Sequence, residues 1–509
     1  MQAVSVQEMR ELEQRFCQET GTAPVQLMEN AGQAVAREAS ALAAHAGARQ
    51  FAVLAGKGNN GGDACVAARL LLEQGADVQL FLAAAPEQYQ GEAGLAWQRL
   101  PATLKNQCRR EFKAEMVQRD CILIDGLLGT GFAGPGLRQP YCAWITEARN
   151  RGGIVLAVDV PSGLNADDGS ATLCLEADLT LTFAVPKRGL LLGEGPRCCG
   201  RLLVADIGIP ATYLPDSSDG LQTFSAADAL ALLKREDFTT YKNRRGHVGV
   251  IGGSRLYPHA PALSAEAALR TGAGLVTLAL PQSCELFCSL PKALMVRRVA
   301  DGGSGFCNAF ALPQLTEMGR NFQALVCGPG WGQAEESLVV LQSLLASRLP
   351  LVLDADGLNL LAAHPECLPE RPAALILTPH PGEMARLQNA FGLESTGSRL
   401  EQAQALAHRS RTVVVLKGCR SVVAAPDGRA HINLSGCPAL ATAGSGDVLA
   451  GICGAFLGQG RDAYEAAALA VFLHGLAGEI LRPIGSRGII ADDLPGALPA
   501  AWSALAANL

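Results

Sequence analysis

Gly56-Lys-Gly-Asn-Asn-Gly-Gly-Asp63 follows an apolar run at 51–55 and precedes apolar residues at helical spacing in 66–72. A strand, a glycine loop and a helix start, in that order, aim backbone N–H groups and a helix dipole at an anion. The stretch is neither a Walker loop nor the G-x-G-x-x-G dinucleotide fingerprint. A tight turn alone explains the glycines. It does not explain two Asn and an Asp, so we favour a binding loop.

The composition is that of a globular protein with more than one domain, because 509 residues exceed an ordinary single domain. A net charge of −6 gives no reason to expect nucleic acid or an anionic membrane as partner. The charged N-terminal stretch lacks the apolar core of a signal peptide, and no apolar run reaches about 18 residues. We therefore expect a cytoplasmic protein without nucleic-acid or membrane partners, and a homo-oligomer by default.

Sixteen cysteines are scattered through apolar segments. No C-x-x-C pair occurs, which removes the commonest zinc and redox spacings. We expect buried free thiols that pack as small hydrophobic side chains.

Strand-like apolar runs alternate with helical stretches throughout, which is typical of parallel α/β sheets covered by helices. The expected strands are 51–55, 121–125, 154–160, 178–185, 247–252, 275–280, 323–327, 351–354, 374–378 and 412–417. Their Val, Ile and Leu content fits sheets buried on both faces. The turn-rich connection around Pro210–Ser225 predicts a seam between domains at 1–217 and 222–509.

In the first half, two strands end in an aspartate, Asp125 or Asp159, that leads into a glycine-bearing loop. Either Asp alone would be explained as the cap of a turn. The carboxyl ends of parallel strands meet at one edge, where open α/β sheets bind ligands. We expect a shared site in which Asn60, Asp125 and Ser162 offer oxygens to a hard cation. Asp159 is a candidate acid or base.

In the second half, Ala441-Thr-Ala-Gly-Ser-Gly-Asp447 opens an apolar helix. Attraction to the helix dipole alone would explain an Asp there. We favour a functional role, in which the loop amides stabilise a developing anion and Asp447 removes a proton from a hydroxyl. The blocks Leu353–Asn359 and Leu377–Glu383 end two further strands. His380 lies between two prolines in a turn, which disfavours a core position.

Together these motifs resemble the NAD(P)H-hydrate repair family. GKGNNGGD, DGLLGTG and DVPSGL are similar to its epimerase domain, and DADGLN, TPHPGE and ATAGSGD to its dehydratase domain. The resemblance spans about 50–190 and 240–450. It implies an α/β chain with an N-terminal Rossmann-like parallel-sheet domain and a C-terminal ribokinase-like α/β domain.

The resemblance implies a bifunctional metabolite repair enzyme, an isomerase and a lyase. It would interconvert the R and S hydrates of NADH or NADPH and dehydrate the S form at the expense of ADP. The products would be NADH or NADPH, AMP and phosphate. K⁺ in the epimerase site and Mg²⁺ with the nucleotide are the implied metal ions.

By motif position the resemblance also implies site residues. The hydrate in the epimerase half would contact Asn59, Asn60, Gly61, Gly62, Asp63, Gly129, Thr130, Gly131, Phe132, Ala133, Gly134, Pro135 and Asp159. The implied K⁺ ligands are Asn60, Asp125 and Ser162. The hydrate in the dehydratase half would contact Ala260, Gly330, His380 and Asp447. ADP would contact Lys417, Gly418, Cys419, Arg420, Ser421 and Gly446. Asp159 and Asp447 are the implied catalytic residues.

Three positions depart from the family pattern: Ala64, His259 and Cys437 stand where the family usually has Gly, Gly and Asn. The departures at His259 and Cys437 touch neither Gly446 nor Asp447, and a methyl group at Ala64 is compatible with a helix start. The alternative interpretation is a ribokinase-like small-molecule kinase with an accessory nucleotide-binding domain, because the same fold supports either activity.

Overall fold

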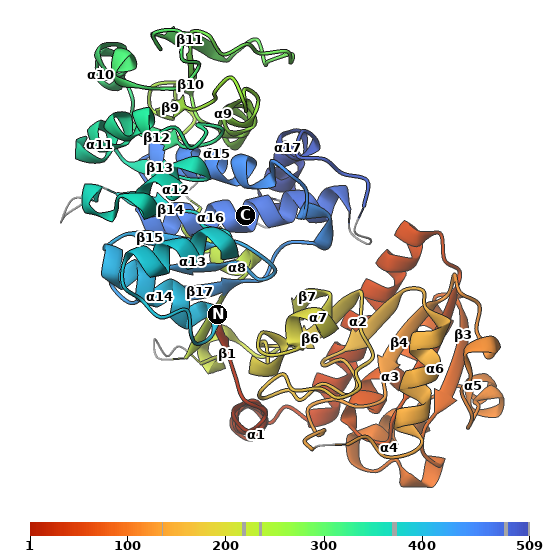
Figure 1. Ribbon diagram of the computed structural model, residues 1–509. Coiled ribbons are helices and arrows are strands. Elements are labelled where there is room, and N and C mark those ends of the chain that lie inside the picture. Colours follow the sequence, from red (N-terminus) through yellow and green to blue (C-terminus); the bar gives the residue numbers. More distant parts are fainter. Residues whose placement is uncertain (135, 216–219, 234–236, 369–373, 483–486, 507–509) are drawn as a thin grey trace. The chain divides into compact units, whose positions relative to one another are not determined.

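The computed structural model describes residues 1–134, 136–215, 220–233, 237–368, 374–482 and 487–506 (Figure 1). The chain divides into two compact units, Met1–Gln222 and Thr223–Leu509. Each unit is built on a largely parallel sheet, so the predicted α/β class is confirmed. All sixteen cysteines are free and nine are buried.

Unit 1 has a six-stranded parallel sheet in the order β3-β2-β4-β5-β6-β7. The strands are β2 (Gln50–Ala55), β3 (Asp77–Leu82), β4 (Ile122–Gly126), β5 (Val155–Val158), β6 (Leu179–Phe183) and β7 (Arg201–Ala205). The four strands expected in this half are confirmed, whereas β3 and β7 were not foreseen. The chain runs from β2 to one side and then returns to β4 on the other. In open parallel sheets such a change of direction is where ligands bind, here at the carboxyl ends of β2 and β4.

The helices of unit 1 cover its sheet. They are α1 (Val6–Thr20), α2 (Pro24–Ala46), α3 (Asn59–Glu73), α4 (Gly91–Gln98), α5 (Ala102–Gln107), α6 (Tyr141–Arg151) and α7 (Gly195–Cys199). Trp144 and Ile145 of α6 pack on alternate residues of the strands, such as Leu54 of β2 and Leu123 of β4. Helix α3 contacts β2 and β4 and packs on α2.

The stretch Gly56–Asp63, expected to be a loop, is helical from Asn59 onward. The helix begins at Asn59, with Gly58 as its N-cap, so Asn59–Asp63 form its first turns. A Cβ atom at Gly61 would lie 1.7 Å from Gly56 O, and one at Gly62 would lie 2.6 Å from Met28 Cε. These glycines therefore serve close packing of the helix. The periodicity of apolar residues does not reveal that first turn, because its residues are small and polar.

Unit 2 has a sheet whose central strands are parallel, in the order β15-β14-β13-β12-β9-β10-β11. These are β9 (His247–Ile251), β10 (Leu275–Pro281), β11 (Met295–Val299), β12 (Ala324–Cys327), β13 (Leu351–Leu353), β14 (Leu375–Leu377) and β15 (Val413–Leu416). The strands β16 (Val422–Ala424) and β17 (Ala430–Asn433) extend it antiparallel from β15. All six strands expected in this half are confirmed.

The strand β8 (Leu221–Phe224) spans the boundary between the two units. Its last two residues pair with β17 in unit 2, and its first two pair with β1 (Gln2–Ala3) in unit 1.

Ten helices have described bounds in unit 2. They are α8 (Ala226–Leu232), α9 (Ala260–Thr271), α10 (Leu312–Gly319), α11 (Leu338–Ala346), α12 (Asp356–Ala363), α13 (Pro381–Ala390), α14 (Arg399–Ser410), α15 (Ser445–Gly458), α16 (Ala463–Leu481) and α17 (Asp493–Ala506). Helices α9, α15 and α16 form the core with alternate residues of the sheet, such as Val248 and Val250.

Helix α16 is long and apolar enough to cross a membrane by length and composition alone. However, 67% of its apolar window is buried inside the structure. It packs against α15 and α17 (Figure 1). Its composition is therefore explained by its place in the core of unit 2.

Candidate active sites

In unit 1 glycines follow β2 and end β4, and the backbone packs closely around them. Gly56 N donates a hydrogen bond to Gly126 O, and a Cβ atom at Gly56 would lie 1.9 Å from Leu127 O. A Cβ atom at Gly126 would lie 2.5 Å from the Ala64 methyl group. Ala64 thus fits only because its neighbour on β4 has no side chain. The Ala64 departure is accommodated without displacing the backbone.

The three implied K⁺ ligands lie together at this edge. Asp125 is fully buried, and its two oxygens accept hydrogen bonds from Ser162 Oγ at 2.6 Å and Ser162 N at 2.8 Å. Asn60 Nδ2 donates to Leu128 O at 2.9 Å, and Leu128 N donates to Ser162 Oγ at 2.9 Å. Asn60 and Ser162 therefore meet at one residue of the β4 loop.

Two features of this oxygen cluster fit a hard cation. Asn60 Oδ1 is buried and accepts no hydrogen bond, which is costly unless something else binds it. Burial raises the pKa of Asp125 to about 6, against the hydrogen bonds from Ser162 that lower it. Among the described residues, no group of three His, Cys, Asp or Glu side chains is placed to hold a metal ion. The donor set is thus amide, hydroxyl and carboxylate oxygen, which suits an alkali cation.

Asp159 ends β5 in a sharp turn with a positive φ of 60°. Its Oδ1 accepts hydrogen bonds from Lys187 Nζ at 2.6 Å, Thr182 Oγ1 at 2.9 Å and Phe183 N at 3.3 Å. Its Oδ2 accepts none from the described residues. One oxygen of the carboxylate is therefore held by β6 and the loop after it, while the other is free for a ligand.

Two more carboxyl groups lie near Asp159: Asp63, which the sequence implied as a substrate contact, and Glu13, which it did not. Burial raises the pKa of Asp63 well above its usual value, and the charge of Asp159 adds to this. Burial also raises the pKa of Glu13 on α1, which Lys187 opposes and Asp159 reinforces. Lys187 comes directly after Pro186, just beyond the end of β6, and the sequence does not show which group it binds. Glu13 gives no signal of a role, because its helix reads as an ordinary surface helix.

The second glycine loop of unit 1 lies largely at the surface. A Cβ atom at Gly129 would lie 3.0 Å from the Asn60 side chain, so this residue borders the oxygen cluster. A Cβ atom at Gly131 or Gly134 would meet open space. Thr130, Phe132 and Ala133 are half-buried or exposed. Pro135 lies outside the described residues.

In unit 2, Asp447 lies in the first turn of α15, as expected, with Gly444 as the N-cap in the left-handed region at φ 88°. Ser264 Oγ of α9 donates to Asp447 O at 2.7 Å, which ties the two helices together. Ser445 N donates to Thr442 O and Val448 N to Gly444 O, whereas Gly446 N and Asp447 N donate to no described residue. The turn therefore presents two unpaired donors and the positive end of the helix dipole.

Lys417, which follows β15, lies near Asp447 and near carboxyl groups that follow β13 and begin α13. Its Nζ lies 2.6 Å from Asp354 Oδ1 and 3.7 Å from Glu383 Oε2. A Cβ atom at Gly446 would lie 3.2 Å from Lys417 Nζ. The absence of a side chain at position 446 thus leaves the ammonium next to the helix start.

This cluster holds more carboxyl groups than cations, and the charge balance governs Asp447. Burial is the largest cause that raises the pKa of Asp447 to about 8. Asp354, Asp356 and Glu383 raise it further, while Lys417 lowers it. Burial also raises the pKa of Asp356 and of Glu383. Such an excess of negative charge suits a divalent cation that arrives with a nucleotide.

Ala260 and Gly330 lie side by side. A Cβ atom at Gly330, whose φ is 67°, would lie 3.3 Å from Ala260 Cβ and 2.4 Å from Tyr257 O. The loop after β12 is also fixed to the loop after β13, because Gly332 N donates to Asp356 Oδ2 at 2.8 Å. These contacts bring the ends of β9, β12 and β13 together.

His380 caps α13, which explains its place between two prolines. Its Nδ1 accepts hydrogen bonds from Gly382 N at 3.0 Å and Glu383 N at 3.4 Å, and Glu383 Oε2 accepts from His380 N. Burial, followed by Lys417 and Arg386, lowers its pKa. This shift favours the neutral ring, and 52% of the side chain is exposed. It borders the Lys417 cluster through Glu383.

The segment 417–421 is held by Arg399, a residue that the sequence did not single out. The Arg399 guanidinium donates to the carbonyl groups of Leu416 and Lys417 at 3.0 Å, and to those of Cys419 and Arg420. Gly418 has φ 144°, and a Cβ atom there would lie 2.9 Å from Arg399 Nη2. This close fit requires glycine.

The side chains of the same segment differ in direction. Arg420 is buried and donates to Leu434 O inside the unit, so only its backbone is available to a nucleotide. Ser421 Oγ donates to Gly418 O at 3.0 Å, and the Cys419 side chain is exposed.

Two polar side chains of the core helix α16 support the glycine-rich start of α15. His474 Nε2 lies 3.1 Å from Ser445 Oγ, and burial lowers the pKa of this histidine to about 4. Glu479 Oε1 accepts from Gly436 N at 2.7 Å. The segment from Gly436 to Ser445 is therefore fixed to α16 at both ends. An apolar helix pattern conceals such residues in the sequence.

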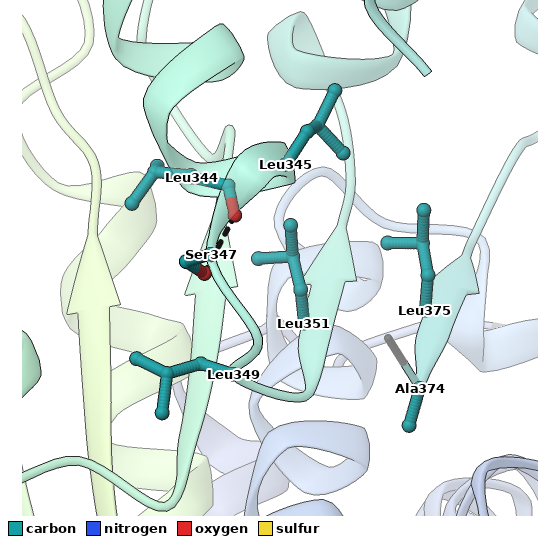
Figure 2. A pocket seen from close by; sticks show the side chains of 7 residues that line it. All are labelled: Leu344, Leu345, Ser347, Leu349, Leu351, Ala374 and Leu375. Carbon is teal, nitrogen blue, oxygen red and sulfur yellow. Dashed lines mark hydrogen bonds between the residues drawn. The ribbon is translucent and has the colours of Figure 1, made fainter. Parts of the chain in front are cut away.

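A small hollow in unit 2 lies at the opposite edge of the sheet (Figure 2). It is lined by Leu344, Leu345, Ser347, Leu349, Leu351, Ala374 and Leu375. Leu351 and Leu375 begin β13 and β14, so the hollow faces the amino ends of those strands. Its volume of about 10 Å³ holds no more than a water molecule. It is not a substrate site.

Known proteins resemble this chain along nearly its whole length. Residues 24–189 match the family profile described as YjeF-related protein N-terminus, and residues 248–499 match that of NAD(P)H-hydrate dehydratase. The chain is 37% identical to the bifunctional NAD(P)H-hydrate repair enzyme of Moorella thermoacetica, over 98% of this chain and 96% of that protein. It is 36% identical to that of Escherichia coli, over 92% and 88%.

Among solved structures, an ADP/ATP-dependent NAD(P)H-hydrate dehydratase from Bacillus subtilis, co-crystallised with ATP and Mg²⁺, is 27% identical. The match has a TM-score of 0.48 and covers 56% of this chain and 99% of that one. The two profile matches, together with 37% identity along nearly the full length, show that the chain belongs to the family of bifunctional NAD(P)H-hydrate repair enzymes.

Proposed function

We propose that unit 1 interconverts the R and S hydrates of NADH and NADPH, and that unit 2 dehydrates the S hydrate with ADP. The domain ranges 1–217 and 222–509 are proposed for these two activities. The observation that carries the proposal is the position of Asp447. Its carboxyl lies in the first turn of α15, near the Lys417 ammonium and the unpaired N–H groups of Gly446 and Asp447, which an anion needs.

In unit 1, inversion at the hydroxyl-bearing carbon requires one of its bonds to break and to reform on the other face. We propose that the free Oδ2 of Asp159 accepts and returns the proton that this step moves. Asn59–Asp63, Gly129–Pro135 and Asp159 contact the hydrate in this proposal. Asn60, Asp125 and Ser162 hold K⁺, which supplies positive charge for the phosphates of the substrate. The buried, unpartnered Asn60 Oδ1 supports this ligand set.

In unit 2, Asp447 removes the proton of the hydroxyl group, and the oxygen attacks the terminal phosphoryl group of ADP. The bond from that phosphorus to AMP breaks as the new P–O bond forms. Loss of phosphate and of a proton from the adjacent carbon then restores the ring double bond. Mg²⁺ bound with the nucleotide supplies positive charge to the phosphates. The carboxyl-rich cluster around Lys417 supports such a cation.

The remaining contacts follow the same division. Ala260, Gly330 and His380 contact the hydrate beside Asp447. Lys417–Ser421 and Gly446 hold ADP, with Arg420 contributing its backbone only. We also propose a cytoplasmic homo-oligomer without nucleic-acid or membrane partners, in line with the charge and composition of the chain.

The test is to incubate the purified chain with hydrated NADPH and either ADP or ATP, and to follow the absorbance of the reduced nicotinamide. Recovery with ADP, accompanied by AMP and phosphate in equal amounts, supports the proposal. Phosphorylation of a small alcohol without any recovery of absorbance would favour the kinase alternative. If the absorbance recovered with ATP and not with ADP, the phosphoryl donor would be ATP.

A further inference from the structure

Lys187 is almost wholly buried, with 1% of its side chain exposed. Its Nζ donates to Asp159 Oδ1 at 2.6 Å, Phe183 O at 3.1 Å and Thr182 Oγ1 at 3.2 Å. An ammonium group has three N–H donors, and these acceptors use all of them. Lys187 therefore has no donor left for a substrate, so it acts on the reaction through the carboxyl groups around it, of which Asp159 is the one it contacts directly.

A buried ion pair is weak evidence for stability, because desolvation offsets the attraction. The more informative feature is what the pair does to the Asp159 carboxylate. Lys187, Thr182 and Phe183 N all bind Oδ1, while Oδ2 accepts no hydrogen bond from the described residues. These three donors fix the plane of the carboxylate, and Oδ2 stays available to a substrate.

Two strained turns on adjacent strands create this arrangement. Asp159 and Ala184 both have φ 60°. Each is the centre of a tight turn, with Val160 N donating to Val158 O and Val185 N to Phe183 O, both at 2.7 Å. Positive φ at residues other than glycine is strained and is often found at functional sites. These two turns place the ends of β5 and β6 side by side, so that Phe183 N and Lys187 Nζ both donate to Asp159 Oδ1.

The N-terminal segment 2–20 binds the backbone of the two residues that flank Lys187. Val4 N donates to Pro186 O and Arg188 N donates to Val4 O, both at 2.9 Å. The backbone is therefore fixed on either side of Lys187. Helix α1 follows directly, and it brings the Glu13 carboxyl near both Lys187 and Asp159. This segment precedes residues 24–189, the part that matches the family profile.

We propose that Lys187, clamped by the N-terminal segment, is a positioning residue that aims the free oxygen of Asp159 at the hydrated ring. The inference rests on the proposed epimerase function of unit 1. Three carboxyl groups face one another here: Glu13 from α1, Asp63 from α3 and Asp159 from β5, with Arg10 near Glu13. Without the ammonium, a negative charge on Asp159 becomes harder to maintain. The acid limb of the epimerase pH profile then moves to higher pH.

The experiment compares the full-length Lys187→Met variant with the wild type. The rate of R-to-S conversion of hydrated NADPH is measured from pH 5 to 9 without ADP, so that unit 2 is silent. We expect kcat to fall ~100-fold or more with KM within about threefold, as for a lost orienting group. The acid limb should also move to higher pH, because the ammonium no longer offsets the three carboxyl groups. Lys105→Met, the same change at a surface lysine that donates to Gln98 O, should match the wild type.

Wild-type kcat and an unmoved pH profile in Lys187→Met would overturn the inference. If thermal melting shows that this variant does not fold, Thr182→Val provides the second test. It removes one donor to Asp159 and one acceptor of Lys187 at nearly constant volume. It should shift the profile in the same direction by a smaller amount, and a wild-type profile would again overturn the inference. Absence of epimerisation in the wild type would instead overturn the proposed function.

Discussion

Lys417 Nζ lies 2.6 Å from Asp354 Oδ1, directly beside the point where a side chain at Gly446 would begin. The pair joins the ends of β13 and β15 to the first turn of α15. Asp447 thereby shares a buried site with Asp354 and with the cation that offsets it. The corresponding pair in unit 1, Lys187 with Asp159, also has a 2.6 Å contact. In each unit a lysine, buried in unit 1 and partly buried in unit 2, pairs with an aspartate at the carboxyl edge of a parallel sheet.

The two activities should separate by single substitutions. Asp447→Asn is expected to reduce dehydration by at least ~100-fold, because the base is lost, while R-to-S conversion continues. Asp159→Asn should do the reverse, so that R-hydrate persists after the S-hydrate is consumed. Both rates are measured on the same preparations by chromatography of the two hydrates. Loss of both activities in a folded variant would contradict separate sites.

Dehydration should depend on pH through Asp447. A base works in its ionised form, so kcat/KM of the free enzyme should rise with pH and level off above a midpoint of about 8. Asp354 raises the pKa of Asp447, so Asp354→Asn should move the midpoint to lower pH. The substitution also frees Lys417 from its ion pair with Asp354, and the Lys417 charge lowers the pKa of Asp447 as well. A midpoint that stays in place in this variant would show that another group titrates.

The same raised pKa predicts a cost in stability. The folded-state pKa of Asp447, about 8, exceeds its usual value of 3.8. Folding is therefore favoured most at low pH, and that contribution is lost as pH rises through 8. Without nucleotide or Mg²⁺, Asp447→Asn should raise the melting temperature at pH 9 but not at pH 4, with each kcal/mol worth on the order of 2–4 °C. Asp427→Asn, an exposed residue paired with Arg429, is the control and should show no such trend.

Potassium should act on unit 1 through Asn60. Replacing KCl with tetramethylammonium chloride is expected to slow epimerisation and lower the melting temperature of the wild type, since a ligand that binds only the folded state stabilises it. Asn60→Leu removes the unpartnered Oδ1 at similar volume, and should abolish both responses. Dehydration of S-hydrate in the same samples reports that unit 2 is intact. A wild-type potassium response in Asn60→Leu would exclude this residue as a ligand.

Arg399 should govern the affinity for ADP without touching the hydrate. Arg399→Met removes the donors to four carbonyl groups of the loop 416–420. We expect KM for ADP to rise on the order of 10-fold, equivalent to about 1.4 kcal/mol, with KM for the hydrate nearly unchanged. Arg386→Met, which loses a hydrogen bond to Asn359 at the surface, is the matched control. An equal rise in both KM values would point to general loosening of unit 2.

Much of the fold was readable because apolar periodicity is a local property. Every strand predicted from an apolar run is present, from β2 to β15, with ends shifted by one or two residues. The strands that were missed, such as β3 and β7, begin with charged residues and carry weaker patterns. The start of α3 was missed because Asn59–Gly62 lack apolar spacing, although they form a helical turn.

By itself, the sequence determined the two parallel α/β units, the glycine-rich turns at their strand ends and the aspartates that follow them. These features depend on neighbours along the chain, so their residue types and spacing are sufficient. Only the tertiary structure decided which charges meet: Glu13 and Lys187 around Asp159, and Asp354, Glu383 and Lys417 around Asp447. The physical reason is that electrostatic coupling depends on distance and burial in space, and neither quantity is written in the spacing of residues along the chain.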